Sequence, residues 1–314
     1  MTNSLLLSID KLFESTACKG NVCIGLDTAA EYIPQAARKD AGNDLQAILA
    51  YNRAIIDAAC GAAACFKVQI AYYEQLGVEG LRVYSQTLKY LREKKQISIA
   101  DIKRGDIADT ALRYAKAHFY GDFEADFVTL NPYMGMDTLT PWIQEAEKTG
   151  KGAFVLLRTS NPGRADFECQ KILAQLNEST GQQTKQNGEH CFLYESLGNK
   201  LSELANEKKG NHGMGIFGAV VGCTETVEAK KIRAAFPNIF FLIPGYGAQG
   251  GGADDAALLL DKAGNGGVVN ASRSILKAWE AQGGGTQIST IKAAAEAALG
   301  ATITMRDAIR GAVL

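Results

Sequence analysis

The stretch ISIADIKRGDIADT, residues 97–110, joins a short apolar run to a group of charged residues and then to a helical pattern. The apolar part is too short for a helix and is rich in isoleucine, which is typical of a strand buried on both faces of a parallel sheet. The charged part begins where such a strand would end. A buried strand followed by polar residues and a helix is the repeating unit of α/β folds.

Similar apolar runs lie elsewhere in the chain, and stretches with helical periodicity separate them. With the first run included, they cover residues 22–26, 65–68, 97–102, 127–130, 153–157, 217–221, 239–243 and 267–269. The helices expected between them include residues 45–59, 80–94, 110–118 and 226–235. Eight strands that alternate with helices predict an α/β fold of the (β/α)8 TIM barrel type, and the rival interpretation is a doubly wound open sheet.

The fifth and sixth runs are separated by about 60 residues, roughly twice the length of an ordinary βα unit. We expect residues 164–215, approximately, to form an elaborated loop with one or two helices, inserted after the fifth strand. A chain of 314 residues could hold two domains, but α/β barrels reach this size as one. The prediction is therefore a single domain over residues 1–314.

Composition narrows the expected partners and compartment. The chain has 33 Lys and Arg residues against 34 Asp and Glu residues, so its net charge of −1 gives no electrostatic reason to expect nucleic acid or an anionic membrane. No apolar run approaches the roughly 18 residues that span a bilayer. The seven cysteines form no C-x-x-C pair and are odd in number, which predicts reduced thiols in a cytoplasmic protein. The three histidines have no ligand-like spacing, so no metal site is expected.

Polar residues stand at the ends of most of the predicted strands. In (β/α)8 barrels the active site lies at the carboxyl ends of the strands, where these residues would meet. Ionisable groups that converge at one place are costly unless function requires them. In chain order the candidates are Asp27, Lys67, Asp101, Lys103, Ser160, Gln249 and Arg273.

The third strand carries the densest group of charges. Asp101 and Lys103 are two residues apart, so their side chains are expected to leave the same face of the strand. Lys67, at the end of the neighbouring strand, could join them. A lysine between carboxylates holds its proton more strongly, and such a cation suits a reaction in which negative charge develops and a proton is then delivered. The alternative is a surface group of ion pairs at the start of a helix, with which Arg104 and Asp109 also agree.

The loops after the seventh and eighth strands form a second candidate site. Residues 244–251, PGYGAQGG, are rich in glycine, and a backbone of this kind can present N–H groups to an anion. These two loops are a frequent phosphate site in barrels, where Arg273 could bind a phosphate with two hydrogen bonds and Gln249 could add its amide. The alternative is that the glycines only permit tight turns.

Taken together, these residues resemble the signature of the orotidine 5′-phosphate decarboxylase family. The pattern Asp-x-Lys-x-x-Asp-Ile-x-x-Thr runs from Asp101 to Thr110, and related barrel decarboxylases and aldolases share its first half. The other motifs follow in the order that the family requires: GLD at 25–27, FKV at 66–68, TSNPG at 159–163, PGYGAQGG at 244–251 and NASR at 270–273. The motifs LDT at 26–28 and SNPG at 160–163 are similar to those of the longer bacterial branch.

The resemblance implies a reaction and the residues that perform it. The reaction is the cofactor-free decarboxylation of orotidine 5′-monophosphate to UMP and CO₂, a step of de novo pyrimidine biosynthesis. Lys103 would donate the proton to C6 of the pyrimidine, and Asp101 would lie beside the substrate carboxylate and hold Lys103. Asp106 and Thr110 match residues that reach across the interface of a homodimer into the partner's active site.

The remaining implied roles concern substrate binding. Asp27 and Lys67 would bind the ribose hydroxyls, with Lys67 completing an alternating Lys-Asp-Lys-Asp chain. Ser160 would contact the pyrimidine edge, and Gln249 and Arg273 would hold the phosphate. The resemblance implies no role for residues 164–215.

The chemistry of this reaction agrees with the charged residues. Loss of CO₂ leaves a carbanion in the plane of the ring, where the ring π orbitals cannot delocalise it, so an electron-sink cofactor offers no obvious help. The remaining route is a fixed ammonium in a site closed to water. Two alternatives stay open: a phosphosugar aldolase or keto-acid-phosphate decarboxylase on a related barrel, which would normally add a magnesium site, and a catalytically inert phosphate-binding barrel.

Overall fold

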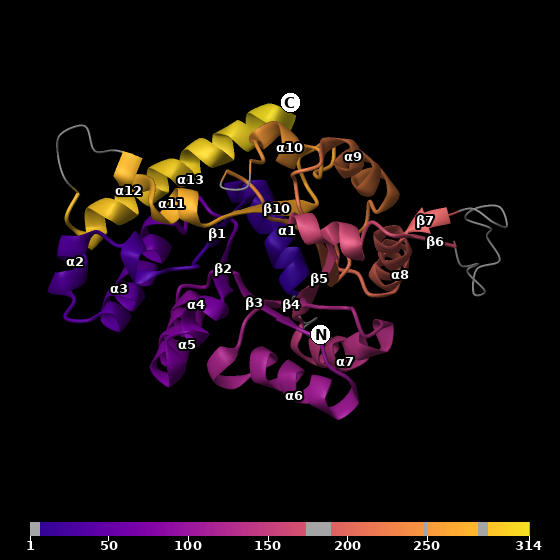
Figure 1. Cartoon of the computed structure of the whole chain (residues 1–314), viewed down its shortest axis with the longest axis horizontal. Helices are drawn as coiled ribbons and strands as arrows, with labels where there is room; N and C mark the ends of the chain where they lie inside the picture. The colour runs from indigo at the N-terminus through magenta and orange to yellow at the C-terminus, as the bar shows by residue number, and fades with distance from the viewer. Residues whose placement is uncertain (1–6, 174–189, 248–249, 282–287, 314) are drawn as a thin grey trace, which may run out of the picture.

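The computed structural model describes residues 7–173, 190–247, 250–281 and 288–313. Its main sheet is a closed barrel of parallel strands in the order β1-β10-β9-β8-β5-β4-β3-β2 (Figure 1). The strands are β1 (Val22–Gly25), β2 (Cys65–Gln69), β3 (Ser98–Arg104), β4 (Phe127–Leu130), β5 (Gly152–Arg158), β8 (Phe217–Val221), β9 (Phe241–Ile243) and β10 (Gly267–Ala271). Because β1 pairs with both β2 and β10, the sheet has no free edge, so the TIM barrel prediction is confirmed and the open-sheet interpretation is wrong.

Helices connect the strands around the outside of the barrel (Figure 1). The α-helices are α1 (Ser8–Lys19), α2 (Gln35–Asp40), α3 (Asp44–Ala59), α4 (Ala71–Glu74), α5 (Gly77–Glu93), α6 (Ala108–Phe119), α7 (Thr140–Thr149), α8 (Leu193–Glu207), α9 (Thr226–Ala235), α10 (Ala253–Ala257), α11 (Arg273–Leu276), α12 (Ala278–Ala281) and α13 (Ile291–Val313). Short 3₁₀ turns are η1 (Ala30–Tyr32), η2 (Gly121–Phe123), η3 (Met136–Leu139) and η4 (Pro162–Asp166). The four helices expected from periodicity correspond to α3, α5, α6 and α9.

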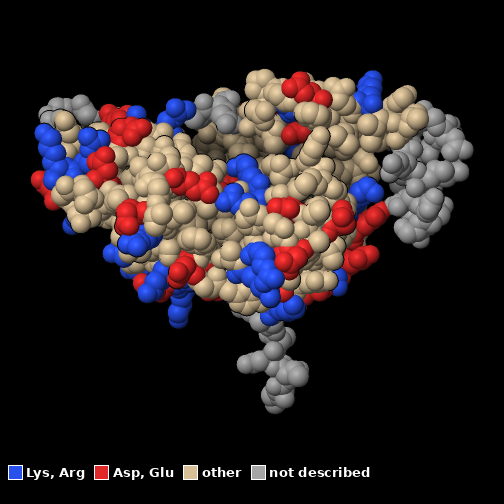
Figure 2. Space-filling view, turned by 60° about the horizontal axis from the view of Figure 1, so that its bottom comes forward, with Lys and Arg blue, Asp and Glu red and all other residues tan. Residues whose placement is uncertain are grey.

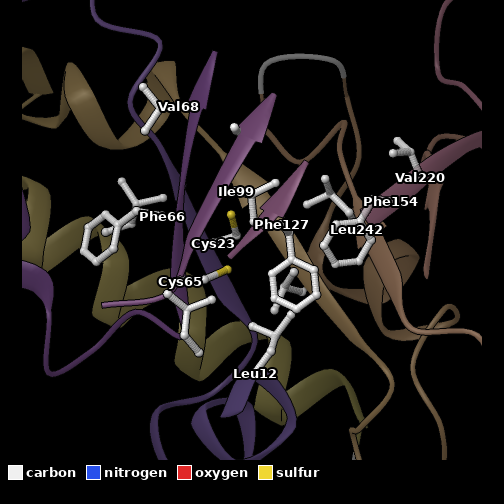
Figure 3. Packing of buried hydrophobic residues seen from close by; sticks show 14 of the residues in the cluster. Leu12, Cys23, Cys65, Phe66, Val68, Ile99, Phe127, Phe154, Val220 and Leu242 are labelled. Carbon is white, nitrogen blue, oxygen red and sulfur yellow. The ribbon is translucent and has the colours of Figure 1, made fainter. Parts of the chain in front are cut away.

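The barrel is filled by the apolar side chains of its own strands, and α1 covers one of its ends. Leu12 of α1 is fully buried and lies at the same end of the barrel as Cys65 and Phe127, which begin β2 and β4 (Figure 3). The Ser15 hydroxyl of α1 donates to the carbonyl of Ala64, the residue before β2, at 2.8 Å. Since α1 covers the amino ends of the strands, the carboxyl ends are left for polar side chains.

The segment between β5 and β8 contains more regular structure than the sequence predicts. It begins with η4, and β6 (Lys171–Leu173) then pairs antiparallel with β7 (His190–Phe192) in a separate two-stranded sheet. Helix α8 follows and packs against β5 and β8 with Tyr194 and Leu201 buried. The expectation of a helix here is met by α8, whereas the two-stranded sheet was not expected. Residues 174–189 lie outside the described residues, and the single-domain organisation stays a prediction.

Acidic and basic side chains are interspersed over the face shown in Figure 2, as the near-zero net charge suggests. No helix in the described part of the chain is long and apolar enough to cross a membrane.

Candidate active site

A cavity of about 350 Å³ lies at the carboxyl ends of the barrel strands. Its volume is within the range of roughly 300–1,000 Å³ that small-molecule sites occupy. Its lining comes from the ends of β1, β2, β3, β9 and β10 and from the loops that follow them: Asp27, Tyr32, Lys67, Gln69, Tyr72, Asp101, Pro244, Gly245, Tyr246, Asn270, Ala271, Ser272 and Arg273. Four of the residues singled out in the sequence, Asp27, Lys67, Asp101 and Arg273, therefore meet at one cavity.

Four side chains from three neighbouring strands form a chain of alternating charge, which we call the charged chain: Asp27, Lys67, Asp101 and Lys103. Lys67 Nζ lies 3.2 Å from Asp27 Oδ1 and 3.0 Å from Asp101 Oδ2, and Lys103 Nζ lies 2.7 Å from Asp101 Oδ1. The side chains of Lys67 and Asp101 are only 6% and 8% exposed, so a surface group of ion pairs does not describe them. That alternative holds for Arg104 and Asp109, which pair with Glu74 and Arg113 near the surface.

The Asp101 carboxylate accepts hydrogen bonds from four donors. Oδ1 accepts from Lys103 Nζ and from the Thr129 hydroxyl at 2.8 Å, and Oδ2 accepts from Lys67 Nζ and from Gln69 Nε2 at 2.9 Å. Burial alone would raise the pKa of Asp101, but the ammonium groups of Lys67 and Lys103 outweigh burial and hold this pKa far below its usual range. Since all four lone-pair positions are occupied, Asp101 is a fixed negative charge rather than a proton acceptor.

Lys67 occupies the middle of the charged chain. Burial acts to lower the pKa of Lys67, but the carboxylates of Asp27 and Asp101 outweigh it and raise this pKa above its usual value. Asp27 is held from its other side by the Ser272 hydroxyl, which donates to Oδ2 at 2.7 Å. Lys103, with 46% of its side chain exposed, is the end of the chain that reaches solvent.

The backbone at Lys103 departs from regular strand geometry. Its φ of +47° lies in the left-handed region, which is unfavourable for a residue with a side chain, and the register between β3 and β4 shifts between Ala100 and Arg104. The Thr129 hydroxyl of β4 accepts from Ile102 N at 3.0 Å and Lys103 N at 2.9 Å, and donates to Asp101. The predicted proximity of Asp101 and Lys103 is thus correct, but it arises at a bulge held by Thr129 rather than from simple alternation.

Sequence reasoning missed three residues that hold the charged chain: Gln69, Thr129 and Ser272. Thr129 offered a signal, because a hydroxyl in the middle of an apolar strand requires a buried partner. Gln69 directly follows the predicted second strand, and Ser272 lies within a quoted motif. Their partners depend on strand register, so only the structure identifies them.

The glycine-rich loop after β9 is built from internal turns. Gly247 N donates to Gly251 O, Gly250 N to Gly247 O and Gly251 N to Gly245 O, at 2.8 to 3.1 Å. Gly245, Gly247 and Gly250 have positive φ angles, which glycine adopts without strain. These three N–H groups are therefore engaged within the loop, and the expectation that other N–H groups of this loop face an anion stays a prediction. Arg273, at the start of α11, and Tyr246 line the cavity, whereas Gln249 lies outside the described residues.

Four predicted site residues in the described part of the chain lie outside the lining of this cavity: Lys103, Asp106, Thr110 and Ser160. Lys103 reaches the cavity only through Asp101, which lines it and lies 2.7 Å from Lys103 Nζ. Ser160 follows β5 and packs against the end of β8, where a Cβ on Gly222 would come within 2.8 Å of the Ser160 Cβ. Asp106 is half-buried and accepts a hydrogen bond from Ile107 N at 2.9 Å, and Thr110 is exposed on α6. Asp106 and Thr110 thus lie past the end of β3, and neither lines the cavity.

Within the described residues, no three His, Cys, Asp or Glu side chains gather in a way that could hold a metal ion. Both carboxylates of the charged chain are instead paired with Lys67.

Comparison with known proteins identifies what the chain resembles. Residues 20–284 match the model of the orotidine 5′-phosphate decarboxylase / HUMPS family. The chain is 54% identical to the orotidine 5′-phosphate decarboxylase of Clostridium kluyveri over 87% of its length and 88% of that protein. It is 50% identical to the orotidine 5′-phosphate decarboxylase of Clostridium perfringens strain SM101 over 97% of its length and 99% of that protein. A crystal structure from Streptomyces avermitilis, of a candidate orotidine 5′-phosphate decarboxylase, matches with a TM-score of 0.74 and 27% identity over 99% of this chain and 97% of that one.

Proposed function

Because this chain belongs to the orotidine 5′-phosphate decarboxylase family, we propose that its charged chain carries out the decarboxylation and that the cavity beside it binds the nucleotide. The protein is a carboxy-lyase that converts orotidine 5′-monophosphate to UMP and CO₂. The observation that carries the assignment of roles is the alternation of Asp27, Lys67, Asp101 and Lys103 at hydrogen-bonding distances.

In the proposed mechanism the bond between C6 and the carboxylate carbon breaks, CO₂ leaves and the electron pair stays on C6. The Lys103 ammonium stabilises that charge and donates its proton to C6, so that a neutral amine remains and takes up a proton from water. Asp101 cannot take the proton, because four donors and its low pKa keep it ionised. No cofactor is required in this mechanism, because the protein supplies both the charge and the proton.

The remaining residues are proposed to bind the substrate. Asp27 and Lys67 line the cavity and offer an acceptor and a donor to the ribose hydroxyls, and Arg273, which lines it from the end of the adjacent strand β10, would bind the phosphate. Gln249 is proposed as a second phosphate ligand on the family resemblance alone, and Ser160 as the residue that contacts the pyrimidine edge.

We further propose that the enzyme is a homodimer in which Asp106 and Thr110 complete the partner's site. Two facts support this: both residues lie past the end of β3, and Ile107 between them is a large apolar residue with 55% exposure. A two-fold partner that covers this region would bring Asp106 to the other subunit's charged chain. All seven cysteines are free, which supports a reducing, cytoplasmic location in which the enzyme serves pyrimidine biosynthesis.

A direct assay tests the proposed function. The purified protein is mixed with orotidine 5′-monophosphate, and the loss of the orotate absorbance is followed with and without EDTA. We expect turnover that EDTA leaves unchanged. Absence of turnover would favour the inert phosphate-binding barrel, and a requirement for magnesium would contradict the proposed metal-free mechanism.

A further inference from the structure

The segment between β5 and β8 begins with a turn at residues 159–160, directly after β5. One side chain further along the segment, Glu168, contacts this turn. We propose that Glu168 is a positioning residue that holds residues 159–160 in place, so that Ser160 can contact the pyrimidine. The inference gives the segment a role in the reaction, and it rests on the proposed function of Ser160.

The Glu168 carboxylate holds Thr159 through its main chain and its side chain. Thr159 N donates to Oε2 at 2.8 Å, and the Thr159 hydroxyl, with its one proton, lies 2.7 Å from Oε1 and also 2.7 Å from Asn161 Oδ1. Hydrogen bonds to an ionised acceptor are about twice as strong as those between neutral groups. Thr159 directly precedes Ser160, so its main chain and side chain are both fixed one residue from the proposed contact with the base.

Glu168 is itself tied to the body of the protein. Its carbonyl accepts a hydrogen bond at 3.1 Å from the N–H of Tyr194, which is buried in the first turn of α8. In the same segment, Arg164 forms an ion pair with Glu225, the residue before α9. The segment is thus anchored on two helices outside the barrel, and its carboxylate is presented to the turn from a fixed place.

The opposite side of the turn is fixed by residues of the barrel. Arg158, which is only 1% exposed, donates from Nη1 to the carbonyl of Thr159 at 2.8 Å and from Nε to Glu228 at 2.8 Å. Gly222 lies against Ser160 so closely that a Cβ would not fit there. The N–H of Thr159 is therefore held by the segment and its C=O by the barrel. Loss of Glu168 removes one of these two restraints and lets Ser160 shift.

The experiment compares a ligand that has the base with one that lacks it. UMP and ribose 5-phosphate share the ribose and the phosphate, and their dissociation constants are measured by calorimetry. Since misplacement of a positioned group by about 1 Å can cost up to about 10²-fold, we expect Glu168→Ala to weaken UMP binding about tenfold and to lower kcat/KM similarly. Ribose 5-phosphate binding should change by less than about twofold. Glu168→Gln, which keeps one acceptor for Thr159 N, should recover part of the loss.

Two comparisons separate positioning from a general effect on folding. Glu195→Ala is the matched control, because Glu195 also lies in the segment and accepts a backbone N–H, that of Phe192 at 2.9 Å, but at the start of α8. It should leave the preference for UMP over ribose 5-phosphate unchanged, even if it lowers the melting temperature as much. In the Ser160→Ala background, Glu168→Ala should cause little additional loss of UMP affinity, because residues that act through one contact are not additive.

The outcomes distinguish this inference from the proposed function. Two outcomes would overturn the inference and leave the function of Ser160 standing. In the first, Ser160→Ala weakens UMP binding selectively but Glu168→Ala does not. In the second, the losses of UMP affinity from the two substitutions add fully, so Glu168 does not act through Ser160. If Ser160→Ala itself leaves UMP binding unchanged, both the role of Ser160 and the inference built on it are overturned. Thr159→Val removes the contacts of the hydroxyl with Glu168 and Asn161 but keeps the hydrogen bond from Thr159 N, so it should give a smaller loss than Glu168→Ala in the same direction.

Discussion

The two sides of the barrel mouth hold their polar groups in different ways. On the β1–β3 side, Lys67 and Asp101 are almost fully buried and fixed by several hydrogen bonds each. On the β9–β10 side, Arg273 is exposed, and in the glycine-rich loop after β9 the N–H groups of Gly247, Gly250 and Gly251 are used within the loop. The first side is ordered before any ligand binds, whereas Arg273 on the second side is a long, exposed side chain.

This difference agrees with a division between chemistry and binding. A charge that stabilises a transition state is most effective when it is already in place, because no reorganisation is then needed as the reaction proceeds. A group that binds a remote phosphate can instead become ordered by the ligand, and that binding energy can assemble the rest of the site. The charged chain should therefore determine kcat, and the β9–β10 side should determine the response to the phosphate.

The largest expected effect tests the chemical side. Lys103→Ala should lower kcat by at least about 10²-fold, because it removes both the fixed charge and the proton donor. The fold and UMP binding should be retained, since Lys103 is half-exposed and contributes little to the core. The measurements are turnover of orotidine 5′-monophosphate, circular dichroism and UMP calorimetry. Lys94→Ala, at a surface lysine paired with Asp57, is the control and should be fully active. Retention of more than about a tenth of the rate would be incompatible with the proposed role.

The next prediction asks whether the charged chain continues into a partner subunit. Lys103→Ala and Asp106→Asn are prepared separately, shown to be nearly inactive, then unfolded, mixed and refolded together. Random pairing makes about half of the dimers mixed, and two-fold symmetry gives each of these one intact site. Activity should therefore rise to about a quarter of the wild-type value per site. A mixture that contains heterodimers but stays at parental activity would mean that Asp106 acts within its own subunit.

A smaller effect, of a different kind, is expected on the β9–β10 side. Arg273→Ala should lower kcat/KM for orotidine 5′-monophosphate by about 10–100-fold, the cost of losing charged hydrogen bonds to a phosphate. The reaction of the phosphate-free nucleoside should be nearly unaffected, because it lacks the group that Arg273 binds. Steady-state kinetics with both substrates is the measurement. Equal losses for both would show that Arg273 does not contact the phosphate, and the contrast between the two sides would then fail.

The same contrast explains how much the sequence could predict. The strands and the four expected helices agree with the structure to within a few residues, because continuous apolar runs and helical periodicity are local signals. Asp27, Lys67 and Asp101 were found because strand ends of a barrel converge. The contacts of Gln69, Thr129 and Ser272 could not be found, since each depends on register between strands or on a bulge. Glu168 lies in a segment for which neither periodicity nor resemblance supplied a position.

The smallest expected effect concerns Thr129, which connects the strained backbone at Lys103 to the carboxylate of Asp101. Its hydroxyl accepts two N–H groups and donates once, which is its full hydrogen-bonding capacity. Thr129→Val keeps the shape and removes all three bonds, leaving the N–H groups of Ile102 and Lys103 without this acceptor. We expect the free energy of unfolding to fall by about 2 kcal/mol, because buried unsatisfied donors are costly.

Thr129→Val should also lower kcat/KM about tenfold, since the left-handed conformation at Lys103 costs about 1–3 kcal/mol and is no longer held once the bulge loses its acceptor. Thr129→Ser keeps the hydroxyl and should restore most of the activity. Thr302→Val is the control, because Thr302 is equally buried and its hydroxyl donates to Ala298 O within α13, far along the chain from the charged chain. It should lower stability without changing kcat/KM. If Thr129→Val loses stability but keeps full kcat/KM, the geometry of Lys103 does not depend on Thr129, and the ordering of the charged chain resides in its ion pairs alone.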